Sequence, residues 1–136
     1  MQVLIDTDIW SLALRRRSKT DLSAPETARS AQLRELISEN RAKLIGPIRQ
    51  EILSGIREKT QFDRLRNALR SFPDEFLISG DYEKAAECSN LCRSNGIAGS
   101  STDFLICAVA LHRGWQIFTN DPDFRTYSQV LSLRLL

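Results

Sequence analysis

One stretch of this chain constrains its fold more than any other: residues 104–111 are all apolar, and Asp103 stands directly before them. Eight residues are too few to cross a membrane, which takes about 18. A helix that is apolar nearly all round is buried at the centre of a folded domain. Its first turn, with Asp103, then opens at a cleft or close to a sheet, although an acidic residue there also complements the helix dipole.

Around this helix, short apolar segments alternate with amphipathic ones. The pattern predicts an α/β fold with a mostly parallel sheet, in which ligands bind beyond the carboxyl ends of the strands. A chain of 136 residues without linker or internal repeat predicts one domain, residues 1–136. The expected strands are 2–5, 43–45, 76–78, 115–119 and 130–136, and the expected helices are 9–14, 25–39, 47–57, 62–72, 82–93, 101–113 and 122–128.

The composition excludes several classes of protein. With 42% hydrophobic and 26% charged residues, the chain is neither disordered nor fibrous. Asp6 and Asp8 interrupt the apolar start, so we expect no signal peptide, no membrane association and a cytoplasmic location. An odd number of cysteines on helical segments argues against a disulfide framework. Cys88, Cys92, Cys107 and His112 would make a zinc set, but no zinc-knuckle spacing is present.

Several acidic residues occupy positions that a solvated turn or helix end does not fully explain. Asp6 follows the expected strand 2–5, and Asp121 follows the strand 115–119, so both should lie on one rim of the sheet. Glu51 borders the apolar stripe of helix 47–57. Gly55, inside that helix, suggests that something approaches closely beside Glu51. The simpler alternatives are turn aspartates at a loop and a glutamate that reaches water.

Carboxylates gathered in one cleft repel each other and require a cation. An all-oxygen set selects Mg²⁺ or Mn²⁺ over zinc. Such an ion lowers the pKa of bound water and stabilises charge on phosphate oxygens, so hydrolysis of a phosphate ester is the expected chemistry. The formal net charge is already +2 with these acids counted as ionised, which favours a nucleic-acid substrate.

Four segments in order, residues 4–8, 47–55, 102–110 and 119–124, resemble the PIN-domain family, in particular its VapC-type toxins of toxin–antitoxin pairs. The resemblance implies a three-layer α/β/α fold with a mostly parallel central sheet. It also implies an endoribonuclease that depends on Mg²⁺ or Mn²⁺ and cleaves RNA, with transfer RNA ahead of ribosomal and messenger RNA. Members are usually dimeric and are inhibited by a small VapB-like antitoxin that occupies the active-site groove.

The resemblance also assigns roles to individual residues. The catalytic quartet falls on Asp6, Glu51, Asp103 and Asp121, of which the three aspartates are the metal ligands and the glutamate supports the site. Further positions that match the family are Asp123, which would contact metal through water, and Thr7 and Thr119, whose hydroxyls would steady the carboxylates or a phosphate.

Other residues have two interpretations each. The cluster of Arg15, Arg16, Arg17 and Lys19 would bind RNA phosphates or complement a helix dipole. His112, on a helix of core character, is expected to be a packing residue rather than a general base. Trp10, Leu12 and Leu14, together with Arg49 and Arg57, would form a dimer or antitoxin surface. Core packing explains the three apolar residues equally well.

Two other functions fit parts of the sequence. Asp6-Thr7-Asp8 is similar to the nucleophile and acid pair of haloacid-dehalogenase phosphatases, but Trp10 stands where that motif has Thr or Val, and no later lysine lies in a suitable motif. A covalent aspartyl-phosphate at Asp6 would favour that alternative. A non-catalytic binding module is the second alternative, and metal binding without RNA cleavage would favour it.

Overall fold

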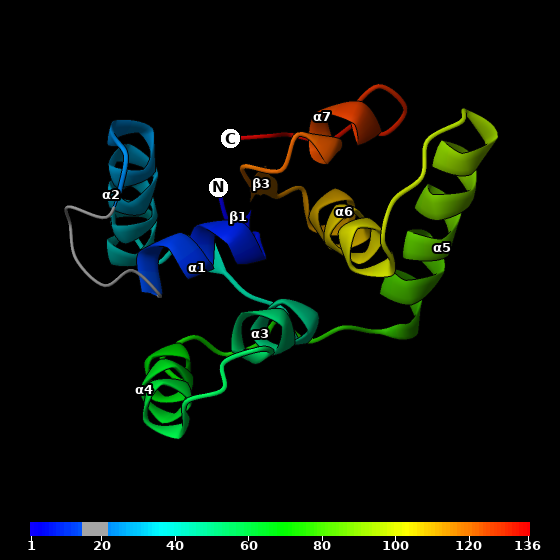
Figure 1. Cartoon of the computed structure of the whole chain (residues 1–136). Coiled ribbons are helices and arrows are strands. Elements are labelled where there is room, and N and C mark those ends of the chain that lie inside the picture. Colours follow the sequence, from blue (N-terminus) through cyan, green and yellow to red (C-terminus); the bar gives the residue numbers. More distant parts are fainter. Residues whose placement is uncertain (15–21) are drawn as a thin grey trace.

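The computed structural model describes residues 1–14 and 22–136, and a small parallel sheet lies at their centre (Figure 1). Its strands are β1 (Val3–Ile5), β2 (Ala42–Lys43) and β3 (Gln116–Phe118), in the order β2-β1-β3. Val3 pairs with Ala42 on one side and with Gln116 on the other. Strand β1 is fully buried, as a strand covered on both faces should be.

Helices cover both faces of this sheet. Figure 1 shows α1 and α2 on one side of β1 and β3, and on the other side α6, with α5 farther out beyond it. The predicted three-layer α/β/α fold with a parallel sheet is therefore confirmed. The helices of the described residues are α1 (Thr7–Leu14), α2 (Ala24–Ser38), α3 (Gly46–Leu53), α4 (Lys59–Leu69), α5 (Ser79–Ser94), α6 (Ser101–Arg113) and α7 (Asp123–Tyr127).

Helix α6 is the buried central helix that the apolar run predicts. Every residue from Phe104 to Ala110 is buried. Before the helix, the Ser100 hydroxyl accepts a hydrogen bond from the Asp103 amide, and after its last residue, Arg113, the helix is capped by Gly114, whose φ of 68° is left-handed. Among the described residues no helix is both long enough and apolar enough to span a membrane.

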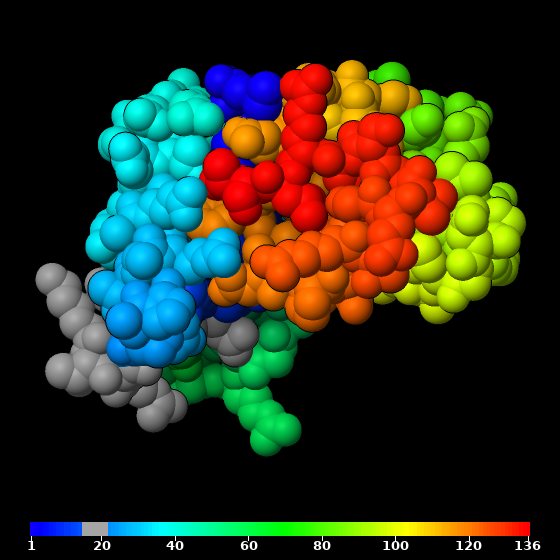
Figure 2. All heavy atoms as spheres, turned by 90° about the horizontal axis from the view of Figure 1, so that it is seen from above, coloured from blue at the N-terminus to red at the C-terminus, as the bar shows by residue number. Residues whose placement is uncertain are grey.

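Two of the expected strands do not form. Residues 76–78 are not paired, and Phe76 and Ile78 are 80% and 56% exposed. In this part of the chain only Asp74 pairs with another segment, through a single bridge to Leu44. The expected strand 130–136 is reduced to a single bridge between Leu135 and Ile117. Figure 2 shows these C-terminal residues, in red, next to the orange segment that contains β3. Apolar residues in both segments predicted strands, but neither segment pairs with a neighbouring strand over several residues.

The helix expected over 47–57 ends earlier, at Leu53. Gly55 lies beyond it with a φ of 84°, and a Cβ added there would meet no atom within 4 Å. A close approach therefore does not explain Gly55: this glycine permits a left-handed backbone conformation after the helix.

Trp10 takes the core position that was one of its two interpretations, whereas His112 does not pack in the core as expected. Trp10 is fully buried and donates its indole N–H to the Ile5 carbonyl at 3.1 Å, so it belongs to the core. The guanidinium of Arg49 binds the Asp74 carboxylate and nearby carbonyls, and so holds α3 against the segment after α4. His112 is exposed, and its Nδ1 lies 3.0 Å from the Asp81 carboxylate, so it is not a core packing residue.

Two groups of residues remain: the cysteines of the zinc alternative and the basic cluster predicted to contact RNA. The thiols of Cys88, Cys92 and Cys107 are buried and free, and burial raises the pKa of each, which makes them poor thiolate ligands. The predicted RNA contacts Arg15, Arg16, Arg17 and Lys19 lie outside the described residues.

Candidate metal centre

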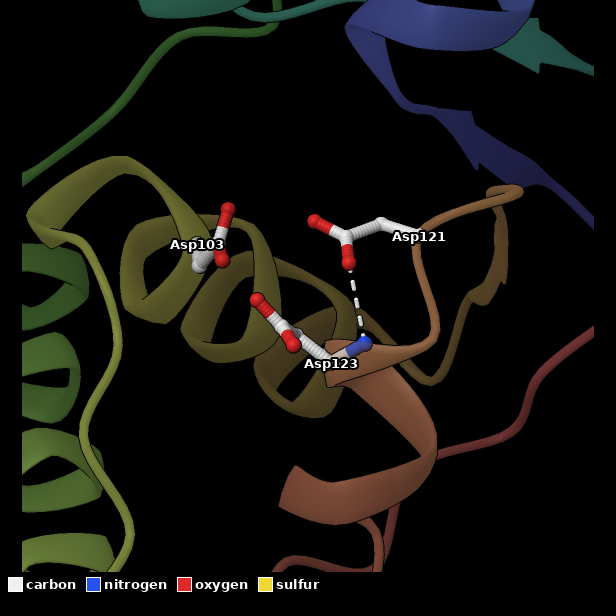
Figure 3. Close-up of side chains that lie close together, drawn as sticks. All are labelled: Asp103, Asp121 and Asp123. Carbon is white, nitrogen blue, oxygen red and sulfur yellow. Dashed lines mark hydrogen bonds between the residues drawn. The ribbon is translucent and has the colours of Figure 1, made fainter.

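Three carboxylates converge at the carboxyl edge of the sheet (Figure 3). One oxygen each of Asp103, Asp121 and Asp123 lies within 4.8 Å of the other two. Asp103 comes from the first turn of α6, Asp121 from the segment after β3, and Asp123 from the start of α7. At this spacing one cation can contact all three carboxylates, directly or through water.

Hydrogen bonds hold the side chains of Asp121 and Asp103 in place. The Asp121 carboxylate accepts from the Asp123 amide at 2.9 Å, and the Asp121 amide donates to the Thr119 hydroxyl at 3.0 Å. The Asp103 carboxylate accepts from the hydroxyl of Tyr127 at 2.7 Å. Side chains supported in this way keep their orientation, which a metal site requires.

Asp6 lies beside this group, at the end of β1, and is only 7% exposed. Its two carboxylate oxygens accept from the Thr7 amide and from the Thr119 hydroxyl, both at 2.7 Å. Thr119 therefore contacts both Asp6 and Asp121. Because β1 and β3 are adjacent and parallel, their carboxyl ends bring these residues to one rim, as the fold class predicted.

Glu51 is connected to the site through a threonine. Its exposed carboxylate on α3 accepts a hydrogen bond from the Thr7 hydroxyl at 2.6 Å, next to Asp6. The structure thus places Thr7 between two members of the predicted quartet. Neither Asp6 nor Glu51 belongs to the group of three carboxylates that lie within reach of one another.

Sequence reasoning missed two residues at this site. The Asp8 carboxylate accepts from the Asn120 amide at 3.0 Å, and its other oxygen is buried without a hydrogen-bond partner in the described structure. The Asp-x-Asp pattern after the first strand was the available signal for Asp8. Tyr127, which contacts Asp103, carried no signal, because nothing local connects two residues 24 positions apart.

The electrostatics of the site disfavour ionised carboxylates. Burial, reinforced by the charges of Asp8 and Asp103, raises the pKa of Asp6 to about 6, even though the bonds from Thr119 and Thr7 oppose this shift. Burial is also the main cause that raises the pKa of Asp103 and that of Asp8. A divalent cation would reverse this preference, because it stabilises the ionised carboxylates.

The donor set fits a hard divalent cation. Every candidate ligand is a carboxylate oxygen, and the group of three contains neither histidine nor cysteine. Oxygen ligands of this kind suit Mg²⁺ or Mn²⁺. The oxygen of Asp8 that is buried without a hydrogen-bond partner among the described residues is a further group that a nearby cation would satisfy.

A separate apolar hollow of about 380 Å³ lies between α5 and the start of α6. None of the carboxylates described above lines it. Its lining is Pro47, Tyr82, Ala85, Ala86, Ser89, Ser101, Thr102, Phe104 and Leu105.

Comparison with known proteins gives a consistent result for sequence and structure. A profile of the PIN domain matches residues 3–129. VapC ribonuclease Mb1587 from Mycobacterium bovis and ribonuclease VapC11 from Mycobacterium tuberculosis are each 31% identical over 138 residues, which is 97% of this chain and 96% of theirs.

Two solved structures share the fold at lower identity. The structure of VapBC2 from Rickettsia felis, bound to a DNA fragment from its promoter, has a chain with a TM-score of 0.77, 15% identity and coverage of 100% of this chain and 98% of that one. FitAcB from Neisseria gonorrhoeae has a TM-score of 0.76, 16% identity and coverage of 99% and 96%. The profile match, the relatives and the fold agree, and the chain belongs to the PIN-domain family.

Proposed function

We propose that this protein is an endoribonuclease that depends on Mg²⁺ or Mn²⁺ and acts as the toxin of a toxin–antitoxin pair. The observation that carries the proposal is the convergence of Asp103, Asp121 and Asp123, which Thr119 connects to Asp6. The curated relatives named as ribonucleases support the activity. The same family membership argues against the phosphatase alternative.

In this proposal Asp6, Asp103 and Asp121 hold the ion, and Asp123 contacts it through water. A bound ion would supply an activated water and stabilise the charge that develops on the scissile phosphate. The hydroxyl of Thr119 orients Asp6, and the hydroxyl of Thr7 orients Glu51. These bonds fix the carboxylates before substrate arrives, so little reorganisation accompanies the reaction.

The substrate we propose is RNA, with transfer RNA first among the classes. The formal net charge is +2 even though the carboxylates of the site are counted as negative. The rest of the protein is therefore more strongly cationic, which favours RNA. Arg15, Arg16, Arg17 and Lys19 remain the predicted contacts to RNA phosphates. An RNA substrate of this kind is consistent with action in the cytoplasm.

We further propose a VapB-like antitoxin and a second copy of this chain as partners. The structural relatives are described as VapBC and FitAB complexes, which supports the antitoxin. Three large apolar side chains, Phe76, Ile78 and Tyr82, are more than half exposed near the start of α5, which supports a homodimer. The profile match over 3–129 supports one domain over residues 1–136.

Cleavage of total cellular RNA tests the function. Purified protein, free of antitoxin, is incubated with Mg²⁺, Mn²⁺ or EDTA, and the new RNA ends are sequenced. Asp6→Asn and Asp103→Asn should abolish metal-dependent cuts, whereas Asp63→Asn on α4, outside the site, should retain them. If both site variants cut at the wild-type rate, the site is wrong. A folded wild-type protein that binds metal but cuts no RNA would instead be a binding module.

A further inference from the structure

We propose that Tyr127 is a positioning residue, which holds the Asp103 carboxylate in the orientation that the cation requires. The inference rests on the metal centre proposed above and adds to it a residue from outside the acidic quartet. Its basis is a buried hydroxyl whose partner is a site carboxylate, a ring fixed by two aromatic neighbours, and a glycine that leaves space for that ring.

The hydroxyl of Tyr127 is well placed for this role. The residue is 1% exposed, and its hydroxyl donates to Oδ2 of Asp103 at 2.7 Å. A buried tyrosine hydroxyl needs a polar partner, and a charged acceptor makes the hydrogen bond stronger. The bond restrains rotation of the Asp103 carboxylate, so its other oxygen keeps one direction and remains available to a cation.

Aromatic packing fixes the ring that carries this hydroxyl. The ring centroid of Tyr127 lies 5.1 Å from that of Phe104, the residue after Asp103. On α7 itself, the ring of Phe124 is 5.3 Å away in an edge-on arrangement of 77°. Both neighbours are buried. The ring therefore has little freedom to turn away from Asp103, since packed interiors allow few other positions.

Gly99 provides the space in which the hydroxyl end of Tyr127 lies. A Cβ added at Gly99 would approach Oη of Tyr127 to 2.5 Å and Cζ of Phe104 to 2.8 Å. Its backbone is not in the left-handed region that other glycines here occupy, so backbone strain does not explain this residue. Lack of space does. The segment before α6 thus lies directly against the hydroxyl end of Tyr127.

Tyr127→Phe tests the hydroxyl while keeping the ring. Mn²⁺ affinity is measured by electron paramagnetic resonance of the unbound ion, after removal of metal with EDTA, on the purified full chain without RNA. We expect Mn²⁺ to bind about tenfold more weakly, the size of effect that loss of a supporting hydrogen bond has on a metal ligand. Ser128→Ala is the control: it removes a hydroxyl at the end of α7 that donates to the Phe124 carbonyl and not to a site carboxylate, so this variant should bind Mn²⁺ as wild type does.

Gly99→Ala provides a second, independent test, because its methyl group displaces the ring and leaves the hydroxyl present. It should also weaken Mn²⁺ binding, whereas Gly80→Ala should not, since a Cβ there has its nearest neighbour at 3.7 Å. Urea unfolding of the metal-free variants measures stability separately. A purely structural role would lower the free energy of unfolding and leave the Mn²⁺ dissociation constant unchanged.

The outcomes separate this inference from the proposed function. If wild type binds Mn²⁺ and Tyr127→Phe binds it within twofold of wild type, the positioning role is wrong and the metal centre stands. The same conclusion follows if only Gly99→Ala weakens binding. If wild type binds no Mn²⁺, the metal centre and this inference are both overturned.

Discussion

The hydroxyl of Thr119 donates a hydrogen bond of 2.7 Å to Asp6, a residue 113 positions earlier in the chain. The same hydroxyl accepts from the amide of Asp121 at 3.0 Å. One side chain thus connects the ends of two neighbouring strands, and it does so at the point where carboxylates from both strands approach each other.

Replacement of Thr119 tests this connection. Thr119→Val keeps the shape of the side chain but removes both hydrogen bonds, so Asp6 and Asp121 lose their common support. We expect RNA cleavage and Mn²⁺ affinity to fall about tenfold or more, as for other residues that support metal ligands. Thr119→Ser should restore most of both. The control Thr126→Val, at an exposed position of α7, should change neither. Wild-type behaviour of Thr119→Val would refute the connection.

Asp121→Asn should have opposite effects on metal binding and on metal-free stability. The substitution removes one of three close negative charges, so the metal-free protein should gain about 0.5 kcal/mol in the free energy of unfolding. Added Mn²⁺ should stabilise wild type and not the variant. Urea unfolding with and without Mn²⁺ measures both effects.

Asp63→Asn is the control for the predicted gain in the free energy of unfolding of metal-free Asp121→Asn. Asp63 lies outside the site and forms ion pairs with Lys59 and Arg66 on α4. Its replacement should not stabilise the metal-free protein, and the response to Mn²⁺ should remain. A metal-free Asp121→Asn that is less stable than wild type would show that the three carboxylates do not repel one another.

The pKa of Asp6, raised to about 6, predicts how metal-free stability depends on pH. The folded state binds this proton more tightly than the unfolded chain does, so the contribution of Asp6 to the free energy of unfolding is fully present below about pH 4. It falls as the pH rises through about 6, by at most about 3 kcal/mol. Asp6→Asn should lack this dependence.

Urea unfolding of both proteins at about pH 4 and about pH 7 checks that prediction. The difference between wild type and Asp6→Asn removes the titration of groups that the two share. Wild type should lose stability relative to the variant as the pH rises. A difference that stays constant, or that changes in the other direction, would mean that burial does not raise the pKa of Asp6.

Arg113 should matter for stability and not for metal binding. Its guanidinium makes two hydrogen bonds, at 2.8 and 3.0 Å, to the Asp81 carboxylate, which is 1% exposed, and it holds the pKa of that carboxyl well below its usual range. Arg113→Met leaves a buried carboxylate without its main partner, which should cost about 3 kcal/mol. Mn²⁺ affinity should not change. The exposed Arg125 serves as the control, and Arg125→Met should leave stability nearly as it is. A change in Mn²⁺ affinity for Arg113→Met would contradict this separation.

Gly55 should be required for its backbone conformation only. Its φ of 84° is unfavourable for alanine, so Gly55→Ala should lower the free energy of unfolding by about 1 kcal/mol. Gly55→Asn should be less harmful, because asparagine tolerates this region better. If Gly55→Asn were the more harmful variant, the position would lack space for a side chain. The structure argues against this, because a Cβ added at Gly55 has no atom within 4 Å.

Local patterns predicted most of the fold. The apolar run before Arg113 indicated the buried helix α6, and alternating strands and helices indicated the parallel sheet; both are confirmed. The exceptions include the end of the helix expected over 47–57 and the strands expected over 76–78 and 130–136. A short apolar segment becomes a strand only if a neighbouring backbone pairs with it over several residues, and pairing depends on distant parts of the chain.

Side-chain periodicity was enough to predict the segments that carry the acidic residues and the rim on which Asp6 and Asp121 lie, because buried strands and helices follow from it. The close group of Asp103, Asp121 and Asp123, the contact of Tyr127 with Asp103 and the contact of Gly99 with Tyr127 arise only in the folded chain. Such contacts depend on how α6 and α7 pack against each other, and no local pattern encodes packing between residues far apart in the chain.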